Sequence, residues 1–110
     1  MIKYVVEFTP EAEEQLMALL LDVAHAASSA TISQKYVGAI VDHCDALCVF
    51  PKRGAMRDDI RPGLRLTNYR GRTVIAFTVD DVNATVSVIG VFYGGQDYET
   101  ALTVAPDMPG

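Results

Sequence analysis

The residues whose types and spacing could carry chemistry lie between Arg57 and Glu99. Arginines occur at every fourth position, at Arg57, Arg61 and Arg65, and two apolar segments then lead to the sequence VFYGGQDYE at residues 91–99. A guanidinium group binds phosphate or carboxylate through paired hydrogen bonds. The arginine series therefore first indicates phosphate chemistry, with the arginines as the cations.

Basic residues are concentrated in one segment of an otherwise acidic chain. The 110 residues include nine Lys and Arg against fourteen Asp and Glu, a net charge of −5. Residues 52–72 hold seven of these bases and only two acids, Asp58 and Asp59, which gives this segment a net charge of +5. The remaining residues hold two bases and twelve acids, net −10. The sequence therefore predicts one locally positive patch.

The elements that must position these residues begin with a strand and a helix. Residues 3–8 alternate in the pattern of a strand. Thr9 suits the N-cap of a helix, Pro10 suits its first position, and acidic residues follow near the positive end of the helix dipole. An apolar stripe at three- and four-residue spacing continues to Ala27, which predicts that one side of this helix faces a core.

A second helix is expected after the small polar residues 28–31. Thr31 or Ser33 can cap it, and apolar residues then line one side until Phe50 and Pro51 end the pattern. Because the connection between the two helices is short, they should form an antiparallel hairpin.

The rest of the chain reads as strands. Three segments have strand character, with turn residues between them, and they predict an antiparallel meander: residues 64–67, 72–79 and 85–93. Residues 96–102 could add one short helix, and the tail 104–110 is expected to be loose. The predicted fold class is α+β, in a single domain over residues 1–103.

Both faces of the last two expected strands look apolar. In the first of these strands, one side carries Ile75, Phe77 and Val79, and the other carries Val74 and Ala76. In the second, one side carries Val86, Val88 and Phe92, and the other carries Ile89, Val91 and Tyr93. Two helices of this size cover only one face of such a sheet. The other face is then shielded by loops or covered by a partner, and we favour the partner.

The cysteines and histidines do not predict a metal site. Cys44 and Cys48 are four residues apart in a helical pattern, a spacing that aligns poorly for a disulfide, so we expect buried small hydrophobes. His43 is beside them, but a tetrahedral site needs four ligands and His25 is the only other histidine.

The sequence shows neither a membrane span nor a leader. No run of eighteen apolar residues occurs, and the first residues lack the features of a signal peptide. We therefore expect a cytoplasmic protein with no membrane partner.

Four segments together resemble the ParE branch of the ParE/RelE toxin superfamily of type II toxin–antitoxin systems. These segments are FTPEA at 8–12, FPKRG at 50–54, RDDIRPGLR at 57–65 and GVFYGGQDYE at 90–99. Each motif is weak alone, but their order and spacing cover nearly the whole chain. The resemblance implies a RelE/ParE-like fold with a short C-terminal helix.

The resemblance also implies a small toxin that a cognate ParD-like antitoxin neutralises, with a partly disordered antitoxin segment wrapping the toxin. ParE relatives poison DNA gyrase, whereas RelE relatives cut messenger RNA on the ribosome. These activities belong to different function classes on one fold, so the fold alone cannot choose between them.

The residues favour gyrase inhibition over RNA cleavage. Metal-free cleavage needs an acid, a base and cations for the phosphorane charge. Neither His25 nor His43 is near the end of the last strand, where the nuclease branch often places its catalytic groups. Tyr93 or Tyr98 would have to act instead, and an unperturbed tyrosine, with a pKa of about 10, is a slow base at neutral pH. A net charge of −5 also suits a ribosome-binding nuclease poorly.

We therefore expect no catalytic residue, no metal and no cofactor. The target-contact candidates are polar residues of the basic segment and the C-terminal motif: Arg57, Arg61, Arg65, Arg72, Tyr93, Gln96 and Tyr98. The antitoxin-binding candidates are apolar residues of the strands: Val74, Ala76, Ile89 and Val91. Sequence-specific nucleic-acid binding by this chain alone is not expected. The alternative to gyrase inhibition is a ribosome-dependent endoribonuclease of the RelE type.

Overall fold

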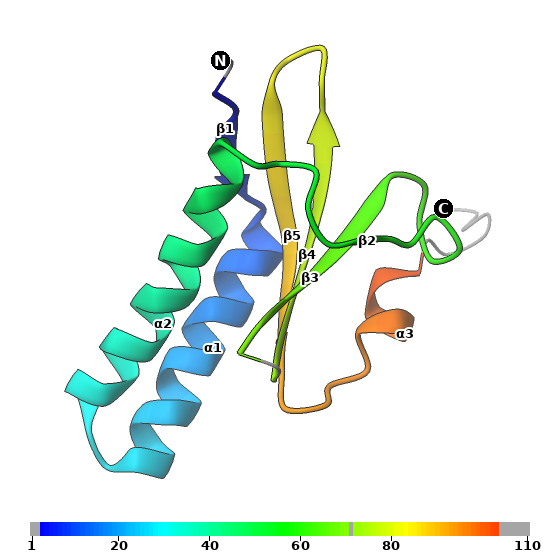
Figure 1. The fold of residues 1–110 in the computed structure, drawn as a ribbon. Helices are drawn as coiled ribbons and strands as arrows, with labels where there is room; N and C mark the ends of the chain where they lie inside the picture. Colours follow the sequence, from blue (N-terminus) through cyan, green and yellow to red (C-terminus); the bar gives the residue numbers. More distant parts are fainter. Residues whose placement is uncertain (1–2, 71, 104–110) are drawn as a thin grey trace.

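The computed structural model describes residues 3–70 and 72–103 of the chain (Figure 1). Its elements are β1 (Val5–Phe8), α1 (Pro10–Ala27), α2 (Ala30–Asp45), the 3-10 turn η1 (Ala46–Cys48), β2 (Ala55–Met56), β3 (Leu64–Tyr69), β4 (Thr73–Asp80), β5 (Thr85–Tyr93) and α3 (Tyr98–Leu102). The α+β class, the helix hairpin, the meander and the short C-terminal helix are confirmed. The expected loose tail, 104–110, lies outside the described residues.

All five strands form one sheet in the order β1-β5-β4-β3-β2. β1 runs parallel to β5, and the other neighbours are antiparallel. The long helices α1 and α2 lie side by side against one face, and the short α3 lies on the other (Figure 1). We call these the helix face and the second face. Within the described part of the chain, no helix combines the length and apolarity needed to cross a membrane.

Helix α1 begins as the sequence predicts. The hydroxyl oxygen of Thr9 accepts a hydrogen bond from the backbone N–H of Ala12 at 3.2 Å, and Pro10 occupies the first helical position. Both features satisfy or remove backbone donors that a helix start leaves free. Ala12 and Leu19 are buried, which seats the apolar stripe of α1 against the sheet.

The N-cap predicted for α2, Thr31 or Ser33, is two or four residues too late in the chain. Ser29 caps the helix, because its hydroxyl oxygen accepts from the N–H of Ile32 at 3.2 Å. Ser33 is instead buried, and its hydroxyl donates to the backbone carbonyl of Leu20 in α1. The connection consists only of Ser28, whose left-handed backbone (φ 52°) ends α1, and Ser29, the N-cap of α2.

A β-bulge corrects the predicted faces of β5. Ala76 pairs with Gly90 and Phe77 with Val88, so Ile89 is an extra residue opposite β4. The extra residue reverses the alternation beyond it. Val91 and Tyr93 therefore lie on the helix face with Val86 and Val88, whereas Phe92 lies on the second face.

The second face is largely covered by the chain itself. Ile60, from the loop between β2 and β3, and Leu102, from α3, pack with Leu64, Ala76 and Phe92 in a second apolar cluster. Ala76 is fully buried there, so the expectation of an open face is wrong at this position. The half-buried Val74 and Ile89 border the cluster.

Candidate functional site

Arg57 is held by carboxylates rather than left free. Its Nε and Nη2 donate to the two carboxylate oxygens of Asp59 at 2.9 and 2.8 Å, and Glu99 of α3 lies 4.0 Å from Nη2. The hydrogen bond to Asp59 raises the pKa of the Arg57 guanidinium, and the same bond lowers the pKa of Asp59. The two groups thus form an ion pair beside α3.

Arg61 also binds within the chain. Its Nε donates to the backbone carbonyl oxygen of Leu102, the last residue of α3, at 3.1 Å. Tyr98 begins the same helix, and its ring lies 6.2 Å from the ring of Phe92 on the second face. Arg57, Arg61 and Tyr98 are therefore brought together around α3, where they connect it to the β2–β3 loop.

Arg72 and Tyr93 form a separate group at the far end of the sheet. The Arg72 guanidinium lies 5.7 Å from the centre of the Tyr93 ring. Tyr93 meets the ring of Tyr36, from α2, edge to face at 5.9 Å and 83°. The Tyr36 hydroxyl and the buried Thr73 hydroxyl share a hydrogen bond of 3.2 Å. Three elements thus converge on Tyr93.

Gln96 belongs to the same group. Its side-chain oxygen accepts from the backbone N–H of Tyr93 at 2.8 Å, across a turn in which Gly94 and Gly95 have φ of 69° and 85°. Glycine adopts this left-handed backbone without a Cβ clash. A cavity of about 140 Å³ opens beside it, lined by Gln15, Ala18, Leu19, Asp22, Val91, Tyr93 and Gln96. This small cavity thus includes Val91, Tyr93 and Gln96 of the C-terminal motif.

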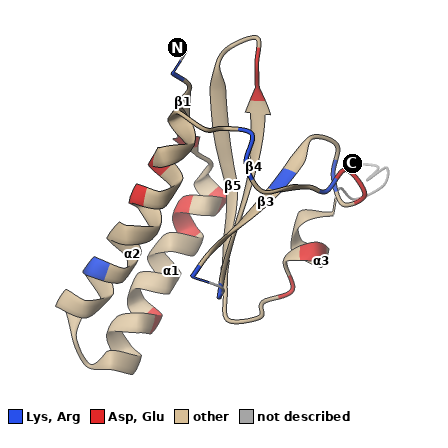
Figure 2. Cartoon of the chain, in the orientation of Figure 1, with Lys and Arg blue, Asp and Glu red and all other residues tan. Residues whose placement is uncertain are grey.

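The seven clustered bases do not form one patch. Figure 2 shows basic positions at both ends of β3. Lys52 pairs with Asp81 at 2.9 Å, Arg57 pairs with Asp59, and Arg65 reaches only the backbone oxygen of Arg53 at 3.4 Å. The expectation of a single positive patch is wrong, because β3 and its flanking loops place bases that are close in the sequence at separate positions in space.

Sequence reasoning missed two further arginine–aromatic pairs. The Arg53 guanidinium lies 5.5 Å from the centre of the Phe50 ring, and that of Arg70 lies 5.5 Å from the Tyr69 ring. The sequence does contain a signal for these two pairs, because each arginine lies within three positions of its aromatic residue. The Arg72–Tyr93 pair had no such signal, because it depends on the pairing of Thr73 with Tyr93 across β4 and β5.

The antitoxin-binding candidates divide between the two faces. Val91 lies in the core of the helix face with 3% of its surface exposed, and Ala76 is fully buried in the second cluster. Val74 and Ile89 remain partly accessible on the second face, on either side of α3. The bulge at Ile89 is the physical reason for the misplacement of Val91.

The groups that could act as acids, bases or ligands are dispersed. Cys44 is buried in the helix-face core, as expected, and burial raises the pKa of its thiol to about 12. Cys48 is only half-buried, so the expectation that it is buried is wrong. His43 lies 5.1 Å from the Tyr69 ring, its Nε2 is buried without a hydrogen-bond partner, and burial lowers its pKa. His25 lies in the last turn of α1. Among residues 3–70 and 72–103, no three His, Cys, Asp or Glu side chains gather as metal ligands would.

Comparison with known proteins gives a family match over most of the chain. Residues 6–98 match the family model for the ParE toxin of the type II toxin–antitoxin system parDE. No curated protein matches the sequence significantly.

Solved structures show the same fold. A chain of the chromosomal ParDE toxin–antitoxin system from P. aeruginosa is 22% identical, with a TM-score of 0.67 over 83% of this chain and 96% of that one. A chain of the RelBE2 toxin–antitoxin complex from Mycobacterium tuberculosis is 21% identical, with a TM-score of 0.62 over 84% and 100% of the two chains. A mutant of the E. coli toxin RelE in the free state is 15% identical, with a TM-score of 0.59 over 93% and 95%.

Proposed function

The chain belongs to the family of ParE toxins of type II toxin–antitoxin systems, and from this membership we propose that it inhibits DNA gyrase and is neutralised by a ParD-like antitoxin. The similar chains from P. aeruginosa and M. tuberculosis come from toxin–antitoxin systems, which supports an antitoxin partner. The proposal includes a cytoplasmic location, where gyrase acts.

The observation that favours gyrase over RNA as the target is that the carboxylate groups nearest to the arginines are engaged as counter-ions, and that the nearby imidazole nitrogen is buried. The carboxylates nearest to Arg57 are its counter-ions, Asp59 and Glu99. The Nε2 atom of His43 is buried, so it is not accessible to a substrate at the surface. A metal-free ribonuclease needs an accessible base and acid beside its cations. The arrangement supports protein binding more than phosphoryl chemistry, and among the target-contact candidates Arg57 and Arg61 serve as anchors of α3.

A supercoiling assay tests the target. Purified gyrase acting on relaxed plasmid is expected to lose supercoiling activity when the purified chain is added, and a translation extract given the same chain is expected to keep its messages intact. Cleavage of translated messages with unaffected supercoiling would instead assign the RelE-type activity.

The antitoxin contact is proposed at the second face, beside α3. One hollow of about 350 Å³ includes Val74 and Tyr98 in its lining, and another of about 340 Å³ includes Ile89 and Leu102. Apolar antitoxin side chains that enter these hollows would bury the remaining accessible surface of Val74 and Ile89. Ala76 would then support the contact from beneath, whereas Val91, on the opposite face of the sheet, would take no direct part in it.

The double substitution V74E/I89E is expected to abolish rescue by the antitoxin, because each new carboxylate would be buried against an apolar side chain. The measurement is growth during co-expression with the product of the adjacent reading frame. The control is Val82→Glu on the β4–β5 turn, where 93% of the side chain is exposed. Equal rescue of both variants would place the antitoxin elsewhere, provided that their melting temperatures match the wild type.

A further inference from the structure

Three arginines lie against aromatic rings and lack an ion-pair partner among the described residues: Arg53 over Phe50, Arg70 over Tyr69 and Arg72 over Tyr93. They differ from Lys52 and Arg57, whose charges are matched by Asp81 and Asp59. A guanidinium that lies over a ring keeps its hydrogen-bonding edge for an outside acceptor. These three arginines are therefore the cations best prepared to bind an anion.

The three pairs are connected through neighbouring residues of α2 and the sheet, one of which, Thr73, is fully buried. His43 lies 5.1 Å from Tyr69, and its lowered pKa is due mainly to burial and also to the nearby charge of Arg53. Tyr69 pairs with Thr73 across β3 and β4, and the Thr73 hydroxyl bonds that of Tyr36. Tyr36 in turn meets Tyr93 at 5.9 Å. These neighbours connect the three pairs from one end of β3 to the other.

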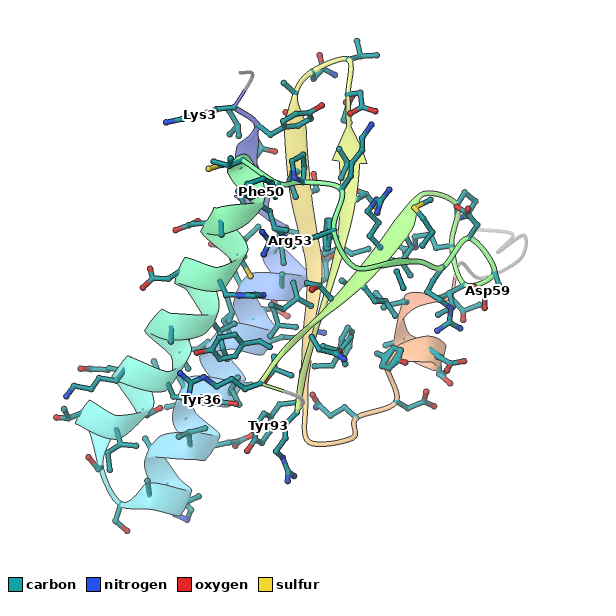
Figure 3. The ribbon with its side chains drawn as sticks, in the orientation of Figure 1. Lys3, Tyr36, Phe50, Arg53, Asp59 and Tyr93 are labelled. Atoms are coloured by element: carbon teal, nitrogen blue, oxygen red, sulfur yellow. The ribbon has the colours of Figure 1, made fainter. Side chains whose placement is uncertain are left out.

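We call this surface the arginine–aromatic strip, and its members are Phe50, Arg53, His43, Tyr69, Arg70, Tyr36, Tyr93 and Arg72. Figure 3 shows Phe50, Arg53, Tyr36 and Tyr93 along the line where α2 faces the sheet. The strip contains three arginines and no acidic residue, in a chain whose net charge is −5. It is therefore a locally basic group of side chains in an acidic chain.

The backbone at Arg70 supports a role for its side chain. Arg70 has φ of 53°, in the left-handed region, within the turn from β3 to β4. Glycine or asparagine occupies such a position with less strain, and another residue costs about 1–2 kcal/mol there. An arginine kept at a strained turn position is a reason to look for a ligand of that arginine.

We propose that the strip docks an acidic peptide segment of a partner protein, with carboxylates on the guanidinium edges and an apolar side chain beside Phe50. The Phe50 ring is 62% exposed, and the adjacent hollow of about 570 Å³ is lined by Tyr4, Val49, Phe50, Pro51, Lys52 and Arg53. Such a hollow accepts an apolar side chain, and the cations around it select acidic neighbours.

A peptide fits this surface better than a nucleic acid does. Single-stranded nucleic acids stack their bases on open aromatic faces and require many phosphate contacts. Here Tyr36, Tyr69 and Tyr93 are half-buried, and arginines lie over Tyr69 and Tyr93. The chain's net charge of −5 also repels a polyanion. The strip shares Arg72 and Tyr93 with the proposed target contact, but the inference does not depend on gyrase being the target.

The test is direct binding of a synthetic probe to the purified full chain. The probe is a fluorescein-labelled peptide in which pairs of glutamates alternate with single leucines, and its binding is followed by fluorescence anisotropy. R53Q/R72Q should weaken binding more than about tenfold, since it removes the charge-assisted hydrogen bonds of two guanidinium groups. Phe50→Ala should weaken it by a smaller factor.

The matched control is R57Q/R61Q, which removes the same charge beside α3, and it should change the affinity less than about threefold. Melting curves establish that both variants are folded. Amide chemical shifts of the wild type provide a second readout, and the peptide should move those of Tyr36, His43 and Tyr69.

Four outcomes would overturn the proposal. The first is that the wild type does not bind the peptide, and the second is that R53Q/R72Q and R57Q/R61Q lose equal amounts of affinity. The third is that an oligothymidine of equal length binds more tightly than the peptide. The fourth is that the chain self-associates and that R53Q/R72Q abolishes this self-association. The last outcome would make a second copy the occupant of the strip.

Discussion

Replacing Phe77 by alanine is expected to lower the free energy of unfolding by about 3–5 kcal/mol. Phe77 is the largest of the fully buried side chains, and it packs in the helix-face core with residues of α1, α2 and β5. The loss combines the removed apolar surface with the cavity that remains. Because a domain of this size is stabilised by only about 5–15 kcal/mol, much of the total stability depends on this ring. Urea denaturation followed by circular dichroism measures the effect.

The control for this prediction is Val82→Ala. Val82 is 93% exposed on the β4–β5 turn, so its truncation should change the unfolding free energy by less than about 0.5 kcal/mol. A loss below about 1 kcal/mol for Phe77→Ala would mean that α1 and α2 do not pack on the sheet as described.

The helix hairpin could be predicted because its signals are local. The N-cap of α1 at Thr9 and its apolar stripe depend on residues within one or two turns of each other. The cap of α2 is harder to predict, because three hydroxyl residues, Ser29, Thr31 and Ser33, lie within five positions of the sequence. Ser33 was a good candidate by type, but its hydroxyl is used for the contact with Leu20, which sequence alone does not show.

The faces of β5 could not be read from alternation, because one extra residue reverses them. Ile89 is that residue, and the reversal moves Val91 and Tyr93 to the helix face. One signal was present in the sequence, since a glycine inside a strand often marks a bulge. In the structure, a Cβ at Gly90 would collide with the ring of Phe92, so the glycine makes room for that ring.

The candidate arginines were identified by type, and their roles depend on tertiary contacts. Asp58 and Asp59 both follow Arg57 directly in the sequence, but of these two only Asp59 binds it; Asp58 instead accepts from the N–H of Gly63 at 2.7 Å. The contact of Arg61 with Leu102 spans 41 residues. Charge counting therefore located the basic segment but could not separate arginines that anchor α3 from those that remain available.

Replacing Gly54 by alanine is expected to cost roughly 2–3 kcal/mol more than the same change at Gly63. Both glycines have left-handed backbone, with φ of 78° and 76°, so the conformational cost of a Cβ, about 1–2 kcal/mol, is shared. They differ in their surroundings. A Cβ at Gly54 would overlap the backbone carbonyl oxygen of Leu66, whereas a Cβ at Gly63 meets nothing within 4 Å. Urea denaturation of the two variants isolates the cost of the overlap.

The Gly54 overlap can be relieved only by moving β2 away from β3, which pair at Ala55 and Leu66. That movement would also shift Arg53, whose carbonyl accepts from Arg65, and with it the end of the arginine–aromatic strip. Gly54→Ala should therefore weaken binding of the acidic peptide even when the variant is fully folded, and Gly63→Ala should not. Equal stability and equal binding in the two variants would contradict the close approach of Gly54 to β3, and with it the fixed position of Arg53.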